Sequence, residues 1–365
     1  MDGSDDIVVC LGACAMDMIF TVARLPDADE MVFAEGEVGF FAGGSTANIA
    51  AGIGRLGHRS RFVGRVGSDD NGRRLRRAFE ADGVDVRWLR EIERGRTAQT
   101  MIAVDRTGQR VIYSLGGEAI LQEPDEFPNE AMENAKVLYI GEVLPDVAIR
   151  AIQVAKTHGA IVIYGPGGGI SWMDNATLNS LIKLCDYVVL SRGELGAVTS
   201  CSSHTEGARR LLESGVGNVV VTLGSEGSEC HSRVRDSSRC GDHDGCDYCN
   251  NDGNYDRNND RNEDRNDDRH DDSNDDGNDV AGGYGDCRHR VFRAEAFNVP
   301  DVIDTTGAGD SFASGFITGL LKGMDIAECL VRGNACAALA IQKVGAREAM
   351  PTKEALEEFL RNAKL

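Results

Sequence analysis

The sequence predicts an α/β fold of three layers, in which a mainly parallel central sheet is covered by helices on both faces. Short apolar runs alternate with amphipathic segments along most of the chain, which is typical of strands that alternate with helices. Hydrophobic residues make up 41% of the 365 residues, enough for a sizeable core. Length alone allows one large domain or two smaller ones, and we expect a single domain over residues 1–365.

The strands of the main sheet are predicted from short apolar runs bounded by polar residues. We expect them at residues 7–11, 61–66, 137–140, 160–164, 187–190 and 218–223. Helices are predicted where apolar residues recur at helical spacing, as at Ala47, Ala50, Ile53 and Leu56. We expect them at residues 45–56, 71–81, 146–157, 176–184, 206–213 and 311–322. Strands joined by helices run parallel in one sheet.

Two early stretches, residues 21–41 and 97–114, look like strands without intervening helices. In the second, Thr107-Gly108 separates residues 101–104 from residues 110–113, a pattern that predicts a β-hairpin. The pattern alone leaves two interpretations open: an antiparallel edge of the main sheet, or a small separate sheet.

The composition excludes several classes of partner. The formal net charge of −20 would repel the phosphates of a nucleic acid. The first six residues are acidic where a signal peptide would be basic, and no apolar run is long enough to span a membrane. The 11 cysteines are spread through apparent core segments, which favours free thiols in a reducing compartment. We therefore expect a cytoplasmic protein with no nucleic-acid or membrane partner.

Residues 236–286 form an acidic low-complexity insertion of Asp, Asn and Arg, with four-residue repeats such as Arg257-Asn258-Asn259-Asp260. With so few apolar residues, the insertion cannot bury enough surface to offset the conformational entropy lost when a chain becomes ordered. We therefore expect it to be disordered. Near its ends, Cys246 and Cys249 form a Cys-x-x-Cys pair that could join Cys240 and Cys287 around a zinc ion. The second half of a zinc pattern is missing, so zinc binding by the insertion stays open.

Residues 304–310 read Asp-Thr-Thr-Gly-Ala-Gly-Asp and precede an apolar segment predicted to be a helix. Gly307, Ala308 and Gly309 are small enough for backbone N–H groups at a helix N-terminus to approach a phosphate. The carboxylate of Asp310 would be unfavourable in a site that only binds phosphate, because the two negative charges repel each other. In a site of phosphoryl transfer, the same carboxylate can take the proton of the attacking hydroxyl. For the tripeptide alone, a glycine-rich loop with Asp310 favouring the helix dipole is an equal explanation.

These residues resemble the C-terminal signature of the ribokinase-like (PfkB) carbohydrate and nucleoside kinases. An N-terminal signature is similar as well: Gly-Gly-Ser-Thr-Ala-Asn-Ile-Ala at residues 43–50, then Gly-Arg-Val-Gly-Ser-Asp at residues 64–69 and Gly72. The two signatures lie in the family's order, and the resemblance covers the chain except for the insertion. It implies a ribokinase-like fold with a small β lid, at about residues 15–42 and 97–115, that closes over the sugar and often forms a homodimer contact.

The resemblance implies an ATP-dependent carbohydrate kinase. Such enzymes transfer the γ-phosphate to a primary hydroxyl of a small sugar of the ribose, fructose or ketodeoxygluconate type. Asp310 would be the general base, and Gly307, Ala308 and Gly309 the anion hole. A nucleoside is the alternative acceptor, and a non-catalytic binding protein on the same fold is the second alternative. A Rossmann dehydrogenase is excluded because no Gly-x-Gly-x-x-Gly follows the first strand.

The resemblance also implies the binding residues. The substrate-binding positions are Asp17, Gly43, Gly44, Asn48 and Glu142, where glycines let the backbone reach hydroxyls and Asn offers a donor and an acceptor. The nucleotide-binding positions are Glu194, Thr222, Gly224, Ser225, Gly227 and Asn334. Glu194 belongs to an Asn-x-x-Glu motif in which this chain has Ser191 instead of Asn.

The cofactors implied are ATP with Mg2+, which neutralises the phosphates, and K+. Asp304, Thr306, Ala340 and Gly345 match positions around a monovalent cation, although Ala349 stands where ribokinases often have Ser. Ser45 stands where ribokinases commonly carry Lys, which argues against a plain ribokinase. Lysines are also sparse, which disfavours a phosphosugar acceptor and leaves a neutral sugar or a nucleoside.

Overall fold

The computed structural model describes residues 6–171, 173–235 and 287–363. The chain divides into two units, residues 1–232 with 291–365 and residues 233–290. In the second unit only the ends of two strands are described. The insertion predicted at residues 236–286, with three of the four cysteines of its zinc pattern, lies outside the described residues.

Ten strands of the described residues form the main sheet, in the order β14-β13-β12-β11-β10-β9-β1-β4-β5, with β6 paired to β4. Every pair from β12 to β5 is parallel, and β13 runs antiparallel to β12. The strands are β1 (Ile7–Leu11), β4 (Arg59–Gly67), β5 (Val84–Asp85), β6 (Leu89–Ile92), β9 (Ala135–Ile140), β10 (Ile161–Tyr164), β11 (Tyr187–Ser191), β12 (Asn218–Thr222), β13 (Ser228–Arg235) and β14 (Cys287–Ala294).

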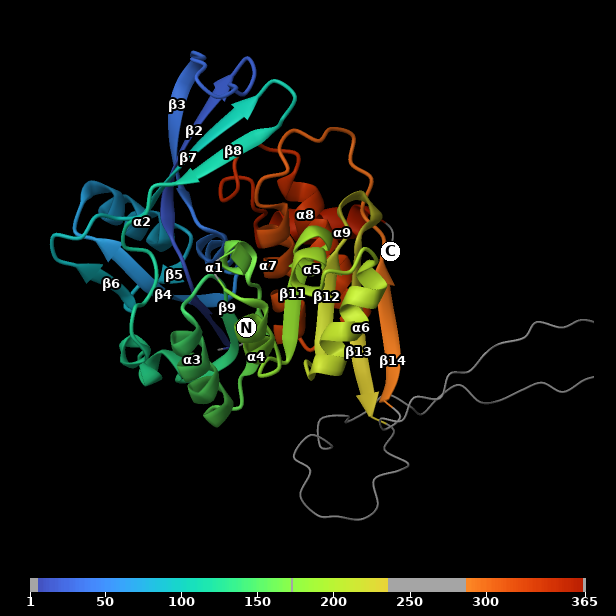
Figure 1. Ribbon diagram of the computed structural model, residues 1–365. Coiled ribbons are helices and arrows are strands. Elements are labelled where there is room, and N and C mark those ends of the chain that lie inside the picture. Colours follow the sequence, from blue (N-terminus) through green and yellow to red (C-terminus); the bar gives the residue numbers. More distant parts are fainter. Residues whose placement is uncertain (1–5, 172, 236–286, 364–365) are drawn as a thin grey trace, which may run out of the picture. The chain divides into compact units, whose positions relative to one another are not determined.

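Helices cover both faces of this sheet (Figure 1). One face packs against α3 (Pro145–Thr157), α4 (Asn175–Ile182), α5 (Arg192–Thr199) and α6 (His204–Ser214). The other packs against α1 (Ser45–Arg55), α2 (Asp70–Ala81), α7 (Ala308–Leu321) and α8 (Ile326–Ala340), and α9 (Lys353–Asn362) packs on α8. Short 3-10 turns are η1 (Pro124–Glu126), η2 (Asn129–Met132), η3 (Gly167–Ser171) and η4 (Gly224–Glu226).

Alternate residues of the central strand β1 pack into the hydrophobic clusters on the two opposite faces of the main sheet. Val9 and Leu11 pack against the α3–α6 side, and Val8 and Cys10 pack against the α1–α7 side. This is the pattern of a strand buried on both faces, because successive side chains point to opposite sides of a sheet. The predicted three-layer fold with a mainly parallel sheet is confirmed.

The elements expected in the main sheet are found within three residues of their predicted bounds. The sequence analysis missed α5, α8, α9 and the short β5 and β6. Most of α8 is buried, so it lacks the contrast between an apolar and a polar face that reveals a surface helix. β13, which begins at Ser228, was not among the predicted strands either.

A second, four-stranded sheet has the order β3-β2-β7-β8 and is called the lid sheet below. Its strands are β2 (Ala15–Val22), β3 (Ala34–Gly43), β7 (Gln99–Asp105) and β8 (Arg110–Ser114). β7 and β8 form the predicted hairpin, with Val104 opposite Arg110. Figure 1 shows these strands in blue to cyan, apart from the main sheet. The edge-strand interpretation is therefore wrong, and the separate small sheet is confirmed.

Glycines bring α7 close to its neighbours. A Cβ on Gly315 would lie 2.7 Å from Arg332 O, and one on Gly319 would lie 2.9 Å from Cys329 Sγ, so α8 packs directly on the α7 backbone. Phe312 and Phe316 of the same helix are 2% and 0% exposed, so both lie in the core.

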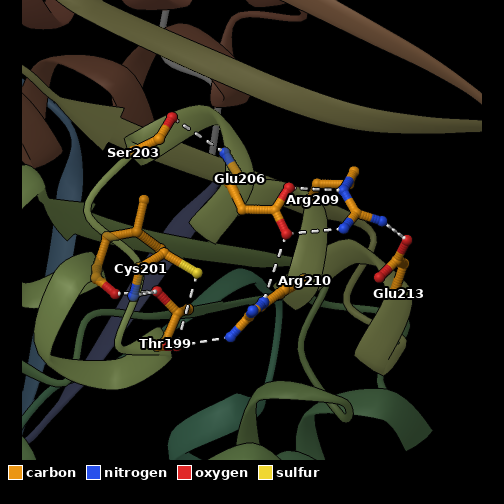
Figure 2. Close-up of polar contacts among 8 residues, drawn as sticks. Thr199, Cys201, Ser203, Glu206, Arg209, Arg210 and Glu213 are labelled. Atoms are coloured by element: carbon orange, nitrogen blue, oxygen red, sulfur yellow. Dashed lines mark hydrogen bonds and ion pairs between the residues drawn. The ribbon is translucent and has the colours of Figure 1, made fainter.

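Polar side chains fix the connection between α5 and α6 on the surface (Figure 2). Ser203 caps α6 by accepting a hydrogen bond from Glu206 N at 3.5 Å. Arg209 pairs with Glu206 and Glu213 one turn to either side, and Arg210 donates to Thr199 O at 3.2 Å. Solvent screens these exposed ion pairs, so the network orients the connection more than it stabilises the fold.

Two composition-based predictions can be compared with the described residues. Free thiols in core segments were expected, and the following cysteines are buried and free: Cys10, Cys14, Cys185, Cys329 and Cys336. Within the described ranges, no helix combines the length and the apolar character needed to cross a bilayer.

Candidate active site

The N-terminus of α1 lies across the carboxyl ends of β1 and β9. Gly12 and Gly141 follow those strands, and a Cβ would lie 2.3 Å (Gly12) or 1.8 Å (Gly141) from Thr46 Oγ1. Gly44 occupies the N-cap position with φ 96 and offers no side-chain cap. Glycine is required at these points, and it leaves the polar side chains of the first turn of α1 at the sheet edge where α/β proteins bind ligands.

Asp310 is held by two side chains of α1. Its Oδ1 accepts a hydrogen bond from Ser45 Oγ at 2.7 Å, and its Oδ2 accepts one from Asn48 Nδ2 at 2.9 Å. Burial raises the pKa of Asp310; the hydrogen bonds from Ser45 and Asn48 oppose that rise, and the charge of Glu194 adds to it. Helix α7 begins at Ala308, so Asp310 lies within its first turn and not before it.

Glu142 lies just beyond β9 and is bound to the same helix. Thr46 Oγ1 donates a hydrogen bond to Glu142 Oε2 at 3.1 Å. Burial raises the pKa of Glu142 to about 7, and the nearby charge of Asp310 contributes to the rise. A raised pKa makes the protonated form of this carboxyl group more accessible, and that form can donate a hydrogen bond to a hydroxyl group as well as accept one from it.

Asp17 approaches the same site from the lid sheet. It lies within β2, where Thr100 of β7 donates a hydrogen bond to its Oδ1 at 2.6 Å. Burial raises the pKa of Asp17; the Thr100 hydrogen bond opposes the rise, and the charge of Asp310 adds to it. The carboxylates of Asp17, Glu142 and Asp310 thus share one neighbourhood. Asp17 is thus a largely buried residue of a strand and does not lie in a solvated turn.

Two more of the predicted substrate positions adjoin these carboxylates. Gly43 ends β3, and a Cβ there would lie 1.9 Å from Asp17 Oδ2. Asn48 is 4% exposed, and its Oδ1 has no hydrogen-bond donor among the described residues. A buried amide oxygen without a donor is costly, so Asn48 Oδ1 is suited to accept a hydrogen bond from a hydroxyl of a bound molecule.

Three of the four predicted cation-site residues lie together. Asp304 accepts hydrogen bonds from Thr306 N and Gly345 N, both at 2.9 Å. Burial acts to raise the pKa of Asp304, but these hydrogen bonds and the charge of Arg110 lower it below its usual value. The fourth residue, Ala340, ends α8, where its carbonyl accepts a hydrogen bond from Lys343 N at 3.1 Å.

The predicted nucleotide-binding residues lie at the ends of β12 and β14. Thr222 ends β12, and η4 then exposes Gly224 and Ser225. Gly227 has φ 90, and a Cβ there would lie 2.1 Å from Ala294 O. Asn334 donates from Nδ2 to Ala294 O and to Glu295 O, both at 3.0 Å. Gly227 and Asn334 therefore fix the course of the chain that follows β14.

Ser191 and Glu194 form a capping box at the start of α5. Ser191 Oγ accepts from Glu194 N at 3.2 Å, and Glu194 Oε2 accepts from Ser191 N at 2.6 Å. Serine is among the best N-cap residues, so the exchange of Asn for Ser keeps the helix start and the position of Glu194.

Sequence reasoning assigned no role to Ser45, Thr46, Thr100 or Arg110, although the first three bind the clustered carboxylates. Arg110, in β8, donates from Nη1 to Thr306 Oγ1 at 2.7 Å. One signal was present: two hydroxyl residues directly follow Gly43-Gly44, at the start of a helix whose cap has no side chain. The contacts of Thr100 and Arg110 depend on strand register, which the sequence does not specify.

Comparisons with known proteins identify the family of the chain. The family model for pfkB family carbohydrate kinases matches residues 5–239 and 279–353. Over 355 residues the chain is 28% identical to an ATP-dependent ribose-1-phosphate kinase of Halopiger xanaduensis, covering 97% of each chain. It is 25% identical over 360 residues to a ribokinase of Staphylococcus aureus, covering 96% of this chain and 98% of the relative.

The fold is also that of a solved relative. The structure of an Arabidopsis thaliana ribokinase complexed with ribose and ATP matches with a TM-score of 0.72 at 22% identity, covering 98% of each chain. The match of the family model over most of the chain and the similarity to curated kinases along nearly its whole length lead to one assignment. The chain belongs to the pfkB family of carbohydrate kinases and is a sugar kinase, a phosphotransferase with an alcohol acceptor.

Proposed function

We propose that the protein transfers the γ-phosphate of ATP to a primary hydroxyl of a small neutral sugar, of the ribose, fructose or ketodeoxygluconate type. The observation that carries this proposal is the position of Asp310, held on both oxygens by Ser45 and Asn48 beside the carboxyl groups of Asp17 and Glu142. Asp310 takes the proton of the acceptor hydroxyl as that oxygen attacks the γ-phosphorus.

The charge of the site supports a neutral acceptor. Asp17, Glu142 and Asp310 can each bind a sugar hydroxyl, and Asn48 Oδ1 offers a further acceptor atom. An acceptor that already carries a phosphate would bring negative charge towards these three carboxyl groups. A sugar 1-phosphate is still the rival acceptor to test, because it is what the name of the Halopiger xanaduensis relative specifies.

The start of α7 supports the proposed anion hole. Gly307 is the N-cap with φ 76, and it makes no side-chain cap hydrogen bond. Gly309 is exposed, and a Cβ there would meet no atom within 4 Å. Backbone N–H groups of Gly307, Ala308 and Gly309 can therefore approach a phosphate without a competing side chain.

The proposed nucleotide is ATP with Mg2+, which neutralises charge on the phosphates when bound. Among the described residues, no group of three His, Cys, Asp or Glu side chains fits a metal ion. Mg2+ usually keeps several waters and is bound through substrate phosphates with one or two carboxylates, so we propose that the ATP phosphates hold it here. Glu194 would orient that water, and the segment from Thr222 to Gly227 with Asn334 would border the nucleotide.

A monovalent cation such as K+ is proposed beside Asp304, Thr306, Ala340 and Gly345. The supporting observation is the closed turn in which Asp304 binds both Thr306 N and Gly345 N next to the anion hole. We expect several-fold higher kcat in potassium chloride than in the chloride of a large organic cation at equal ionic strength. Equal rates in the two salts would exclude the cation site.

A homodimer through the lid sheet is also proposed. Phe40, Met18, Met101 and Tyr113 are successive partners across its four strands, on the face opposite Asp17. Phe40 and Tyr113 are 54% and 52% exposed. Exposed apolar residues that form one contiguous patch, unlike isolated ones, mark a surface that binds a partner. Light scattering should give twice the chain mass, and Phe40→Asp should give the monomer. A monomeric wild-type protein at micromolar concentration would refute the dimer.

The acceptor proposal is tested by ADP release with a panel of sugars, sugar phosphates and nucleosides, followed by identification of the phosphorylated product. The proposal expects the highest kcat/KM for a neutral sugar. If only sugar 1-phosphates or only nucleosides are phosphorylated, the acceptor belongs to that class and is not a neutral sugar. Turnover of none of them would favour the non-catalytic alternative.

Ser45→Ala is expected to move the acidic limb of the pH profile of kcat/KM to higher pH. The Ser45 hydrogen bond lowers the pKa of Asp310, so its loss raises that pKa and leaves less carboxylate at low pH. A hydrogen bond to a charged group is worth about 1.5–3 kcal/mol, so activity below the midpoint should fall at least about 10-fold. Ser45→Thr, which keeps the hydroxyl, is the matched control. An unchanged limb in Ser45→Ala would contradict this role.

A further inference from the structure

The lid sheet carries an arginine on the face that bounds the proposed active site. Asp17 is paired with Thr100, and Thr100 is paired with Ser114 across β7 and β8. Moving along the hairpin towards its turn in steps of two residues, the next pairs are Ile102 with Ile112 and Val104 with Arg110. Side chains alternate between the faces of a sheet, so Arg110 shares the Asp17 face. The register therefore fixes the side on which Arg110 lies.

Arg110 reaches the sequence that forms the proposed anion hole. Its Nη1 donates to Thr306 Oγ1 at 2.7 Å, and Thr306 directly precedes Gly307, the N-cap of α7. The contact joins residues 196 positions apart, one in a strand of the lid sheet and the other in the turn that precedes α7. The guanidinium is thus placed beside the N–H groups that would receive the terminal phosphate.

The partner of Arg110 is unusual for a guanidinium. Within the described part of the chain, the one hydrogen bond of the Arg110 side chain goes to the neutral hydroxyl of Thr306, and the carboxylate of Asp304 is near enough to interact with Arg110 through its charge. By contrast, Arg106 on the same hairpin is bound by two hydrogen bonds to Glu35, at 3.2 and 2.5 Å. A planar guanidinium has five donors suited to bidentate contact with phosphate, and most of those of Arg110 remain available.

We propose that Arg110 is a catalytic residue of the lid: it exchanges Thr306 for the γ-phosphate of bound ATP and stabilises the phosphoryl group during transfer. This rests on the proposed function. In the step, a bond forms between the acceptor oxygen and the γ-phosphorus, and the bond from that phosphorus to the β–γ bridging oxygen breaks. ADP leaves with the electron pair, and the acceptor proton passes to Asp310. Arg110 gains and loses no proton.

The position of the lid sheet is thereby coupled to phosphoryl transfer. Asp17 and Arg110 lie on one face of one small sheet, so a single lid position brings an acceptor ligand and a phosphate ligand to the site together. A cation at the transferred group stabilises charge that spreads over its oxygens in the transition state. The lid would then complete the catalytic site only when both substrates are bound.

The test compares Arg110→Ala and Arg110→Lys with Arg106→Ala, a matched loss of an exposed arginine from the same hairpin. Calorimetry should show about 10-fold weaker binding of a non-hydrolysable ATP analogue to Arg110→Ala and unchanged binding of ADP, which has no γ-phosphate. Removal of one strong donor to the transition state typically lowers kcat about 100-fold, which we expect here. Arg110→Lys should recover part of the loss, and Arg106→Ala should match wild type.

Three results would overturn the role of Arg110. Equal loss of affinity for ADP and the ATP analogue would place Arg110 elsewhere on the nucleotide. A raised acceptor KM with unchanged kcat and unchanged analogue binding would assign it to the acceptor. Wild-type behaviour of Arg110→Ala in both assays would leave it without a role. The nucleotide-binding comparison needs no turnover, so it is independent of whether the acceptor or the general base has been identified correctly.

Discussion

Asp310→Asn is expected to abolish most turnover while ATP still binds. The amide has almost the shape of the carboxylate but cannot take a proton, so the acceptor hydroxyl loses its base. General base catalysis contributes about 10²–10⁴-fold, and we expect a fall in kcat towards the upper end of that range. The measurement is steady-state kcat with the best acceptor, together with the dissociation constant of a non-hydrolysable ATP analogue.

The structure indicates how this variant should be controlled. Ser45 and Asn48 both donate to Asp310, so the new amide group would face a donor and shift slightly. A thermal melt checks that the fold survives. Asp70→Asn is a matched control, since Asp70 is an exposed aspartate in the first turn of α2. Retention of more than about a tenth of wild-type kcat in Asp310→Asn would exclude Asp310 as the general base.

Gly43→Ala is expected to remove acceptor binding by displacing Asp17. The added Cβ would lie 1.9 Å from Asp17 Oδ2 and 2.4 Å from its Cγ, so the carboxylate must leave its position. Asp17 is a side chain that can turn away at moderate cost, so the change should act on function more than on folding. Loss of one hydrogen bond from a sugar hydroxyl to a carboxylate corresponds to at least about a 10-fold lower kcat/KM for the acceptor.

The nucleotide side of the site should be unaffected by this substitution. The dissociation constant of the ATP analogue is expected to match wild type. Gly196→Ala is a matched control, because Gly196 lies in α5 and its added Cβ would make only an ordinary contact, 3.5 Å from Cys201 O. If Gly43→Ala keeps the acceptor KM and kcat of wild type, Asp17 does not bind the acceptor.

Much of the fold could be predicted from sequence because local patterns determine it. Strands such as β1 and β9 are short apolar runs, and α7 shows buried phenylalanines at helical spacing with glycines where α8 approaches. In contrast, α8 has apolar residues around its whole circumference, and β5 has two residues, so neither leaves a periodic signal.

Of the candidate site, the sequence alone revealed two separate motifs and not their arrangement in space. Gly43-Gly44-Ser45-Thr46-Ala47-Asn48 and residues 304–310 could be recognised from their residues, but their contact could not. The hydrogen bond from Ser45 to Asp310 spans 265 positions and depends on α1 packing against α7. The contact of Arg110 with Thr306 depends on the register of β7 and β8, and a slip by one residue would move that side chain to the other face.

The most direct test of the central claim is a crystal structure of the ternary complex with the preferred acceptor and a non-hydrolysable ATP analogue. The distance that decides is the one from the carboxylate of Asp310 to the acceptor hydroxyl that becomes phosphorylated. The account predicts hydrogen-bond distance, about 2.6–3.2 Å, with that hydroxyl in line with the γ-phosphate. A hydroxyl bound to another carboxyl group and out of reach of Asp310 would contradict it.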